Sequence, residues 1–288
     1  MSAKERGFTV RIFIPFGDPE GLRIIEKANW VGQGVVFPRS QYEQASKRNE
    51  LKRTGVYILW GPDTGTELPR IYIGEGDNVL DRLNMHHQQK DFWTHAVVFT
   101  SKDDNLNKAS VKFIEAKLVK LAKDAKMSIL DNNQTPSYPH LSEADQADTE
   151  AFLSDMLLCL PLVGADFFEK TKKPEKGRKV RYLIRSKNIE AHGYESVKGF
   201  VVEKGSYAVV EEVPSIPSSW KRLRETLVEQ GILAKEGSIY KFTQDYEFKS
   251  PSAAASAILG RSANGRIEWK TEDGKTLKEI QERQISSL

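Results

Sequence analysis

Apolar residues in the middle of the chain follow the pattern of β-strands. Residues 54–61 (TGVYILWG) and 70–76 (RIYIGEG) are rich in β-branched and aromatic residues, and a polar, turn-rich run joins them. This pattern predicts a β-hairpin. Residues 95–101 (HAVVFTS) predict a third strand, and residues 126–132 (KMSILDN) predict a last short extended piece.

Two further segments have helical spacing. In residues 78–87 (NVLDRLNMHH), the apolar residues and the pair His86–His87 recur at helical intervals. Residues 107–125 place an apolar stripe along one side of a helix, formed by Val111, Ile114, Leu118, Leu121 and Ala125. The order β-β-α-β-α-β predicts a small α+β unit with a central sheet.

Composition shifts predict four parts along the chain: an N-terminal β-rich extension (1–50), the α+β unit (51–168), a basic linker (169–181) and a C-terminal accessory domain (182–288). The extension has strand patterns at 8–14 and 34–38 and a polar, helix-like run at 41–53. Ser142 can cap a further helix because Asp145 lies three residues after it.

The C-terminal part also mixes strand and helix patterns, which predicts an α+β domain. Strand patterns cover 181–186 and 199–212, and a helix that starts at 218 ends at Gly231, a typical C-cap. A helix of small residues follows at 251–260. Residues 262–275 predict a closing hairpin.

Composition is that of an ordinary globular protein, with 39% hydrophobic and 29% charged residues. No window approaches 18 consecutive apolar residues, and the N-terminus has no apolar stretch before a cleavage site, so neither a membrane span nor a secretory signal is expected. The single cysteine, Cys159, lies in an apolar run. It excludes an internal disulfide and a cysteine-based zinc site, and it fits a reducing cytoplasm.

Positive charge is clustered at two places, although the net charge is only +3. The linker holds seven basic and two acidic residues and is either a solvated linker or an arm that contacts phosphates through Lys172, Lys173 and Arg178. The C-terminal part places a tryptophan among basic residues, namely Arg261, Arg266 and Trp269. Trp269 is either the core residue of a hairpin or a platform on which DNA bases stack.

Five side chains in the α+β unit carry the candidate chemistry: Tyr57, Tyr72, Arg82, His86 and Glu115. A hairpin can bring the two tyrosines to one face, and the helix that follows places Arg82 and His86 one turn apart. Glu115 shares a side of its helix with the apolar stripe, where a carboxylate is costly unless it has a partner or a metal. Each residue alone has an ordinary structural explanation, and only the combination is specific.

This combination suits the hydrolysis of a phosphodiester bond. Glu115 can supply an oxygen ligand to Mg²⁺ or Mn²⁺, with water and the phosphate supplying the others. Arg82 matches the phosphate oxygens with its planar donors. A tyrosine hydroxyl or His86 can take the proton of the attacking water, and His87 beside His86 leaves the choice of histidine open.

The motifs Gly55-Val56-Tyr57 and Tyr72-Ile73-Gly74 resemble those of the GIY-YIG nuclease superfamily, with GVY in place of GIY. The resemblance covers about residues 54–135. It implies a small three-stranded antiparallel sheet flanked by helices. The implied catalytic set is Tyr57, Tyr72, Arg82, His86, Glu115 and an asparagine, which is Asn132 or Asn133, with Asn132 preferred. Residues 14–40 and 248–270 resemble a bacterial subgroup that carries an uncharacterised C-terminal domain.

Three functions follow as hypotheses. The first is a cytoplasmic, divalent-metal-dependent DNA endonuclease with one active site per chain, for which cutting both strands needs a homodimer or two successive nicks. The second is a nucleic-acid-binding protein with an inactive nuclease fold. The third is a structural or interaction module, which predicts that salt-sensitive DNA binding is absent.

Overall fold

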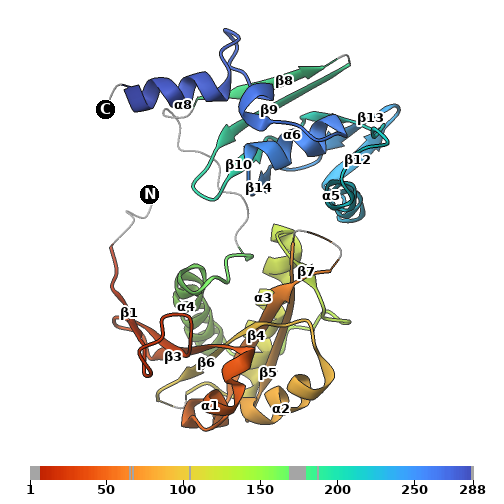
Figure 1. The fold of residues 1–288 in the computed structure, drawn as a ribbon. Coiled ribbons are helices and arrows are strands. Elements are labelled where there is room, and N and C mark those ends of the chain that lie inside the picture. The colour runs from red at the N-terminus through yellow and green to blue at the C-terminus, as the bar shows by residue number, and fades with distance from the viewer. Residues whose placement is uncertain are drawn as a thin grey trace. The chain divides into compact units, whose positions relative to one another are not determined.

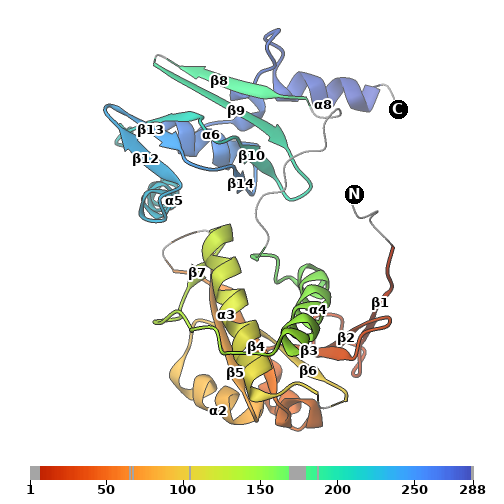
Figure 2. The ribbon, with the colours of Figure 1, turned by 180° about the vertical axis from the view of Figure 1, so that it is seen from behind.

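The computed structural model describes residues 7–64, 66, 68–103, 105–168, 180–186 and 188–286. The chain divides into two compact units. The N-terminal unit comprises Met1–Thr64 and Leu68–Lys170, and the C-terminal unit comprises Gly65–Glu67 and Thr171–Leu288. Figure 1 and Figure 2 show the ribbon from two opposite sides.

A seven-stranded sheet with the order β1-β2-β3-β6-β4-β5-β7 forms the centre of the N-terminal unit. Its strands are β1 (Val10–Phe13), β2 (Arg23–Lys27), β3 (Gly32–Pro38), β4 (Gly55–Pro62), β5 (Pro69–Gly76), β6 (His95–Ser101) and β7 (Ile129–Leu130). Neighbouring strands pair antiparallel except β5 and β7, which pair parallel. Strand β4 is buried on both faces, which explains its continuous apolar run.

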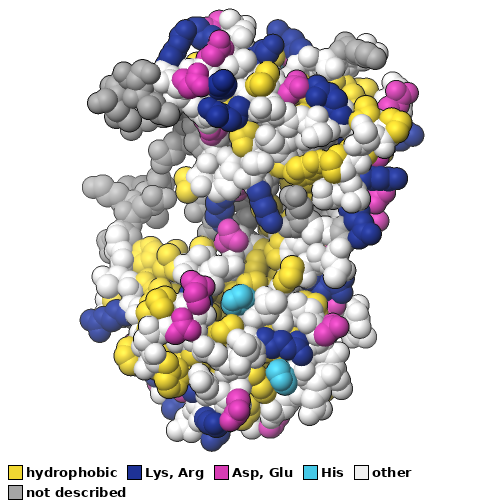
Figure 3. Space-filling view, viewed as in Figure 1, with side chains coloured by type: hydrophobic (Ala, Val, Ile, Leu, Met, Phe, Trp, Pro, Cys, Tyr) yellow, Lys and Arg dark blue, Asp and Glu magenta, His cyan; other side chains and the backbone are white. Residues whose placement is uncertain are grey.

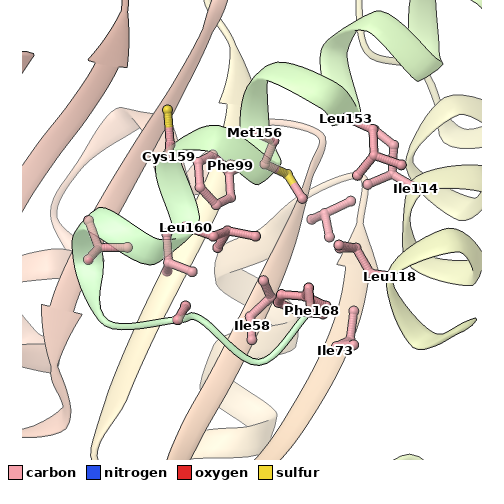
Figure 4. Close-up of a cluster of buried hydrophobic side chains, with 14 of the residues drawn as sticks. Ile58, Ile73, Phe99, Ile114, Leu118, Leu153, Met156, Cys159, Leu160 and Phe168 are labelled. Carbon is pink, nitrogen blue, oxygen red and sulfur yellow. The ribbon is translucent and has the colours of Figure 1, made fainter. Parts of the chain in front are cut away.

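Helices cover both faces of this sheet, as Figures 1 and 2 show. The helices are α1 (Tyr42–Ser46), α2 (Val79–Gln89), α3 (Lys108–Ala125) and α4 (Glu143–Cys159). Side chains alternate along β4, so Ile58 packs on the core beneath α3 and α4 while Leu59 packs on the core beneath α1 and α2. Figure 4 shows Ile58 and Ile73 of the sheet among side chains of α3 and α4.

The sheet has seven strands, where three are expected from the resemblance. Strand β3 pairs with β6 from Gly32 to Pro38, and β2 and β1 add to its outer side. The apolar run of β6 is buried on both faces and needs a neighbour along each edge, and β3 supplies the one that the smaller sheet lacks. Residues 23–27 (RIIEK), for which no strand is predicted from the sequence, form β2.

Helix starts in this unit follow their capping residues. Asn78 accepts a hydrogen bond from Leu80 N and begins α2, while Asn107 accepts from Ser110 N and begins α3. The expected cap at Ser142 is confirmed, because its hydroxyl accepts from Asp145 N at 3.1 Å. The polar run at 41–53 does not form one helix but splits into α1 and a short 3₁₀ turn.

The C-terminal unit is α+β, with a four-stranded sheet of order β14-β10-β9-β8 and a three-stranded sheet of order β11-β13-β12. The strands are β8 (Tyr182–Ser186), β9 (Ile189–Glu195), β10 (Phe200–Val202), β11 (Tyr207–Val209), β12 (Leu233–Glu236), β13 (Ile239–Phe242) and β14 (Tyr246–Phe248). The helices are α5 (Ser218–Glu229), α6 (Pro251–Leu259), α7 (Gly265–Glu268) and α8 (Leu277–Ser286). Within the described ranges, no helix is both long and apolar enough to traverse a lipid bilayer.

The closing hairpin expected at 262–275 forms only around its Asp273-Gly274 turn, where an isolated antiparallel bridge joins Lys270 to Thr276. Gly265–Glu268 forms the short helix α7 instead of a strand, because the side chain of Asn264 accepts from Arg266 N and caps it.

Candidate active site

The two motif tyrosines lie close together on the face of the sheet that α2 covers. Tyr57 of β4 is fully buried, and its ring centre lies 6.2 Å from that of Tyr72 on β5. Gly74 is paired with Tyr57, and a side chain at this position would lie 2.3 Å from the Tyr57 hydroxyl oxygen. The glycine of the second motif therefore makes room for the phenol of the first.

His86 of α2 completes an aromatic cluster with the tyrosines. Its Nε2 lies 2.9 Å from the Tyr57 hydroxyl, and its ring centre lies 4.6 Å from that of Tyr72. Burial lowers the pKa of His86 to about 4, and the charges of Lys90 and Arg82 add to this effect. The imidazole is consequently neutral at pH 7. His87 instead stacks on Tyr42, at 4.2 Å between ring centres, so His86 is the histidine of the cluster.

Arg82 lies on α2 one turn before His86 and is solvent-exposed. Its charge acts on the Tyr57 hydroxyl. Burial alone lowers the pKa of Arg82, but Tyr57, Tyr72 and Glu75 outweigh it and the net shift is upward. Burial raises the pKa of the Tyr57 phenol, with Tyr72 adding to the rise and Arg82 opposing it. Tyr57 is therefore a neutral phenol at physiological pH.

Glu115 lies on the helix that covers the other face of the sheet. It lies on α3 beside Ile114 and Leu118, which pack on the core of that face. In the described part of the chain no strand pairs with the outer edge of β5 at Gly74–Gly76. The charge of Arg82 acts on Glu115, although α2 and α3 cover opposite faces of the sheet. Tyr57, Tyr72, Arg82 and His86 thus form one cluster, and Glu115 is linked to it through the charge of Arg82.

Glu115 is held as a partly buried acid. Burial raises its pKa to about 7, the neighbouring Glu75 adds to the rise, and Arg82 and Lys108 oppose it. Glu75 itself pairs with Lys108, with 2.8 Å between carboxylate and ammonium. Added positive charge near Glu115, such as that of a cation, favours its ionised form.

Asn132 acts as a short extension of the sheet. Its side-chain oxygen accepts from Ile73 N at 3.0 Å, and its side-chain nitrogen donates to Ile73 O at 2.7 Å. The amide thus satisfies both outward-facing backbone groups of the residue between Tyr72 and Gly74. Asn133 is solvent-exposed. These contacts favour Asn132 over Asn133, and they give it the task of fixing the strand that carries Tyr72.

Three further side chains belong to the site but were not predicted: Glu75, Lys90 and Asp131. Glu75 follows the second motif directly, and Lys90 lies four residues after His86, the same spacing as between Arg82 and His86. This spacing was a usable signal for Lys90. Asp131 directly precedes Asn132 in the sequence, but its pairing with Lys90 joins residues far apart in the chain, and no local pattern predicts it.

The predicted DNA-contacting residues lie partly inside and partly outside the described ranges. Lys172, Lys173 and Arg178 lie outside the described residues. Arg261 pairs with Glu268 at 2.7 Å, and the exposed Arg266 donates to the side chain of Gln281 at 3.0 Å.

Trp269 was predicted as a platform for DNA bases or as a core residue. It is fully buried, and its indole N–H donates to Pro251 O. Burial excludes its ring from base stacking, so the base-stacking prediction for Trp269 is wrong and its core alternative is confirmed. On the face drawn in Figure 3, Lys and Arg side chains are intermixed with acidic and apolar ones on each unit.

The donor set at the site fits a hard cation that keeps most of its water. No group of three or more His, Cys, Asp or Glu side chains is placed to share a metal ion among the residues that the structure describes. Glu115 offers one carboxylate, whose pKa is raised by burial and by Glu75 against the opposing charges of Arg82 and Lys108. Mg²⁺ accepts such an arrangement, with one protein carboxylate and the remaining oxygens from water and a phosphate.

Comparison with known proteins gives information on the C-terminal unit. Residues 182–281 match a family described as a domain of unknown function (DUF4357). No curated protein and no solved structure matches the chain. The match covers about a third of the chain and does not include the cluster around Tyr57. A function for that cluster therefore has to be argued from its geometry.

Proposed function

We propose that the N-terminal unit is a divalent-metal-dependent DNA endonuclease of the GIY-YIG type. The observation that carries this proposal is the hydrogen-bonded pair Tyr57–His86, which lies beside Tyr72, together with the charge of Arg82, which acts on both Tyr57 and the partly buried Glu115. Phosphodiester hydrolysis needs a group that holds the phosphate, a group that takes a proton and a ligand for a cation, and the cluster contains all three.

In this proposal Arg82 binds the scissile phosphate. Its planar donors match two phosphate oxygens, and its place beside a neutral phenol leaves its charge available for the anion. Glu115 would hold Mg²⁺ or Mn²⁺, which polarises the phosphoryl oxygen and stabilises the charge that develops on the 3′ oxygen. Asn132 keeps Tyr72 in place through the backbone of Ile73.

Tyr57 and His86 together accept the proton of the attacking water. Because the imidazole is neutral, Nε2 can accept the hydroxyl proton of Tyr57 at 2.9 Å when the ring proton is on Nδ1. Tyr57 Oη then takes a proton from water as it releases its own. The negative charge of a bound phosphate raises the pKa of His86 toward the range in which an imidazole is an effective base.

A cleavage panel tests the proposal. Supercoiled plasmid, linear, branched and single-stranded DNA are incubated with Mg²⁺, with Mn²⁺ or with a chelator. Metal-dependent nicking or cleavage is expected for the natural chain and is lost in Glu115→Gln and Arg82→Ala. Glu143→Gln, an exposed position on α4, serves as the matched control and keeps full activity.

The outcome of the panel also decides between the functions that the sequence left open. DNA binding that persists without cleavage of any substrate would contradict the endonuclease and favour a binding protein with an inactive fold. Each chain contributes one site, so cutting both strands requires a homodimer or two successive nicks. We propose a cytoplasmic location, where a free thiol such as the buried Cys159 stays reduced.

A further inference from the structure

Lys90 lies directly against the proposed active site although its residue type gives no hint of catalysis. It follows the last residue of α2, one turn after His86, and its ammonium nitrogen lies 4.4 Å from the centre of the Tyr72 ring. The His86 ring lies 4.6 Å from the same ring. Tyr72 is therefore contacted by two side chains of one helix, an imidazole and an ammonium group.

Asp131 holds the ammonium group in this place. Its carboxylate lies 2.5 Å from Lys90 Nζ and 3.5 Å from Arg70 Nη1. The backbone of Asp131 is fixed in turn, because its N–H donates to Ile71 O at 2.7 Å, and the next residue is Asn132. The side chains of Lys90 and Asp131 are each only about one-fifth exposed, so solvent screens this pair less than an exposed pair.

We infer that Lys90, anchored by Asp131, is a positioning residue that holds the Tyr72 ring against His86 and supplies a positive charge beside the imidazole. The inference rests on the proposed function for its catalytic meaning, but its contacts are independent of it. Asp131 and Asn132 would then fix Tyr72 in two ways, Asp131 through the lysine over the ring and Asn132 through the backbone of the following residue.

The charge has a measurable consequence at His86. The groups that face this imidazole are Tyr57 from β4, Tyr72 from β5, Arg82 and Lys90 from α2, and Asp131 after β7. Burial is the largest cause of the low pKa of His86, Lys90 and Arg82 lower it further, and Asp131 raises it. Removal of the Lys90 charge therefore moves the pKa of His86 upward.

The test is an NMR titration of the histidine side chains in the full chain. Lys90→Met removes the charge but keeps an apolar stem on the Tyr72 ring, and Asp131 retains Arg70 as its ion partner. Lys90→Arg keeps the charge. A His86→Gln variant assigns the His86 signal, and His192, which pairs with Glu190 in the C-terminal unit, is the internal control.

The inference predicts an upward shift of the His86 pKa in Lys90→Met, no shift in Lys90→Arg and no change of His192 in either variant. An unchanged His86 in Lys90→Met, or an equal shift in both variants, would overturn it. Because the titration needs no cleavage, its result tests the inference about Lys90 independently of the nuclease proposal. Where the natural chain cleaves DNA, Lys90→Met is expected to lower the rate about tenfold at pH 7, because the loss of the positioned Tyr72 ring outweighs the stronger basicity of His86, and Lys90→Arg restores it.

Discussion

At the scale of single residues, burial drives three site groups toward their neutral forms. Burial raises the pKa of Tyr57 and of Glu115, and it lowers the pKa of His86. The charged groups around the cluster are Arg82 and the ion pairs Lys90–Asp131 and Lys108–Glu75. A cation near Glu115 would favour its ionised form, and a phosphate near Arg82 would meet a positive charge.

Glu115→Gln should stabilise the fold at alkaline pH while it abolishes cleavage. The folded-state pKa of Glu115 is raised to about 7 from 4.5, so the stability that it contributes is complete below pH 4.5 and is lost as the pH rises through 7. With a discount for solvent screening, we expect the free energy of unfolding of the variant at pH 8 to exceed that of the natural chain by about 1 kcal/mol. Urea titrations at pH 8 and pH 5 measure this, and the difference should shrink at pH 5.

The same titrations report on the cation. Addition of Mn²⁺ at pH 8 should stabilise the natural chain and leave Glu115→Gln unchanged, because a ligand stabilises only the form that binds it. Equal stabilisation of both proteins would place the metal elsewhere and remove the role assigned to Glu115.

Tyr57→Phe should reduce cleavage by at least about 100-fold, because it removes the hydroxyl between the attacking water and His86. The ring remains in the core, so the variant should stay folded, with a loss of about 1–3 kcal/mol for the unpaired His86 Nε2. Steady-state cleavage rates and thermal melting measure the two effects. Tyr182→Phe, a buried tyrosine of the C-terminal unit, is the matched control, and a comparable loss of cleavage in it would count against a specific role for Tyr57.

At the scale of elements, the site depends on the open end of β5. Gly74 leaves space for the Tyr57 phenol, a side chain at Gly76 would lie 3.0 Å from Arg82 Cγ, and the amide of Asn132 continues the ladder at Ile73. The helices begin at fixed residues, because Asn78 caps α2, which carries Arg82, and Asn107 caps α3, which carries Glu115.

Asn132→Ala should loosen this edge, whereas Asn133→Ala should not. Loss of the amide leaves the N–H and C=O of Ile73 without their partner, so the amide proton of Ile73 should exchange faster and cleavage should fall. Hydrogen exchange read by NMR measures the first effect. Equal exchange in the two variants would show that the asparagine is not needed to fix the strand.

Sequence patterns predicted the elements of this unit better than their assembly. The alternation around Tyr57 and Tyr72 and the stripe of α3 were sufficient to predict the hairpin and its helices, because these are local patterns. The pairing of β3 with β6 joins residues that are 57 to 69 positions apart, and no local pattern encodes it. The same limit applies to Asp131, whose partner Lys90 is distant in sequence.

At the scale of the whole molecule, the proposed active site and the family match lie in different units. The N-terminal unit contains the proposed chemistry, and the C-terminal unit carries the match to a domain of unknown function. The core of the C-terminal unit includes Trp269, which packs on Phe200 with 4.4 Å between ring centres. The sequence alone does not decide between core and surface for this tryptophan, because it lies among charged residues such as Arg266 and Lys270, which are themselves exposed.

Trp269→Ala should destabilise the C-terminal unit by about 3–5 kcal/mol, since it opens a large cavity in a core. Calorimetry should show a lowered transition for that unit and an unchanged transition for the N-terminal unit. A variant with unchanged melting and weakened DNA binding would instead support a role of the tryptophan at a DNA surface.

The most direct measurement is a crystal structure of the slow Tyr57→Phe variant with uncleaved DNA and Mn²⁺. Our account predicts an anomalous manganese peak about 2 Å from a Glu115 carboxylate oxygen, with the scissile phosphate between the ion and Arg82. A manganese ion that lies away from Glu115, or a phosphate that binds without Arg82, would contradict it.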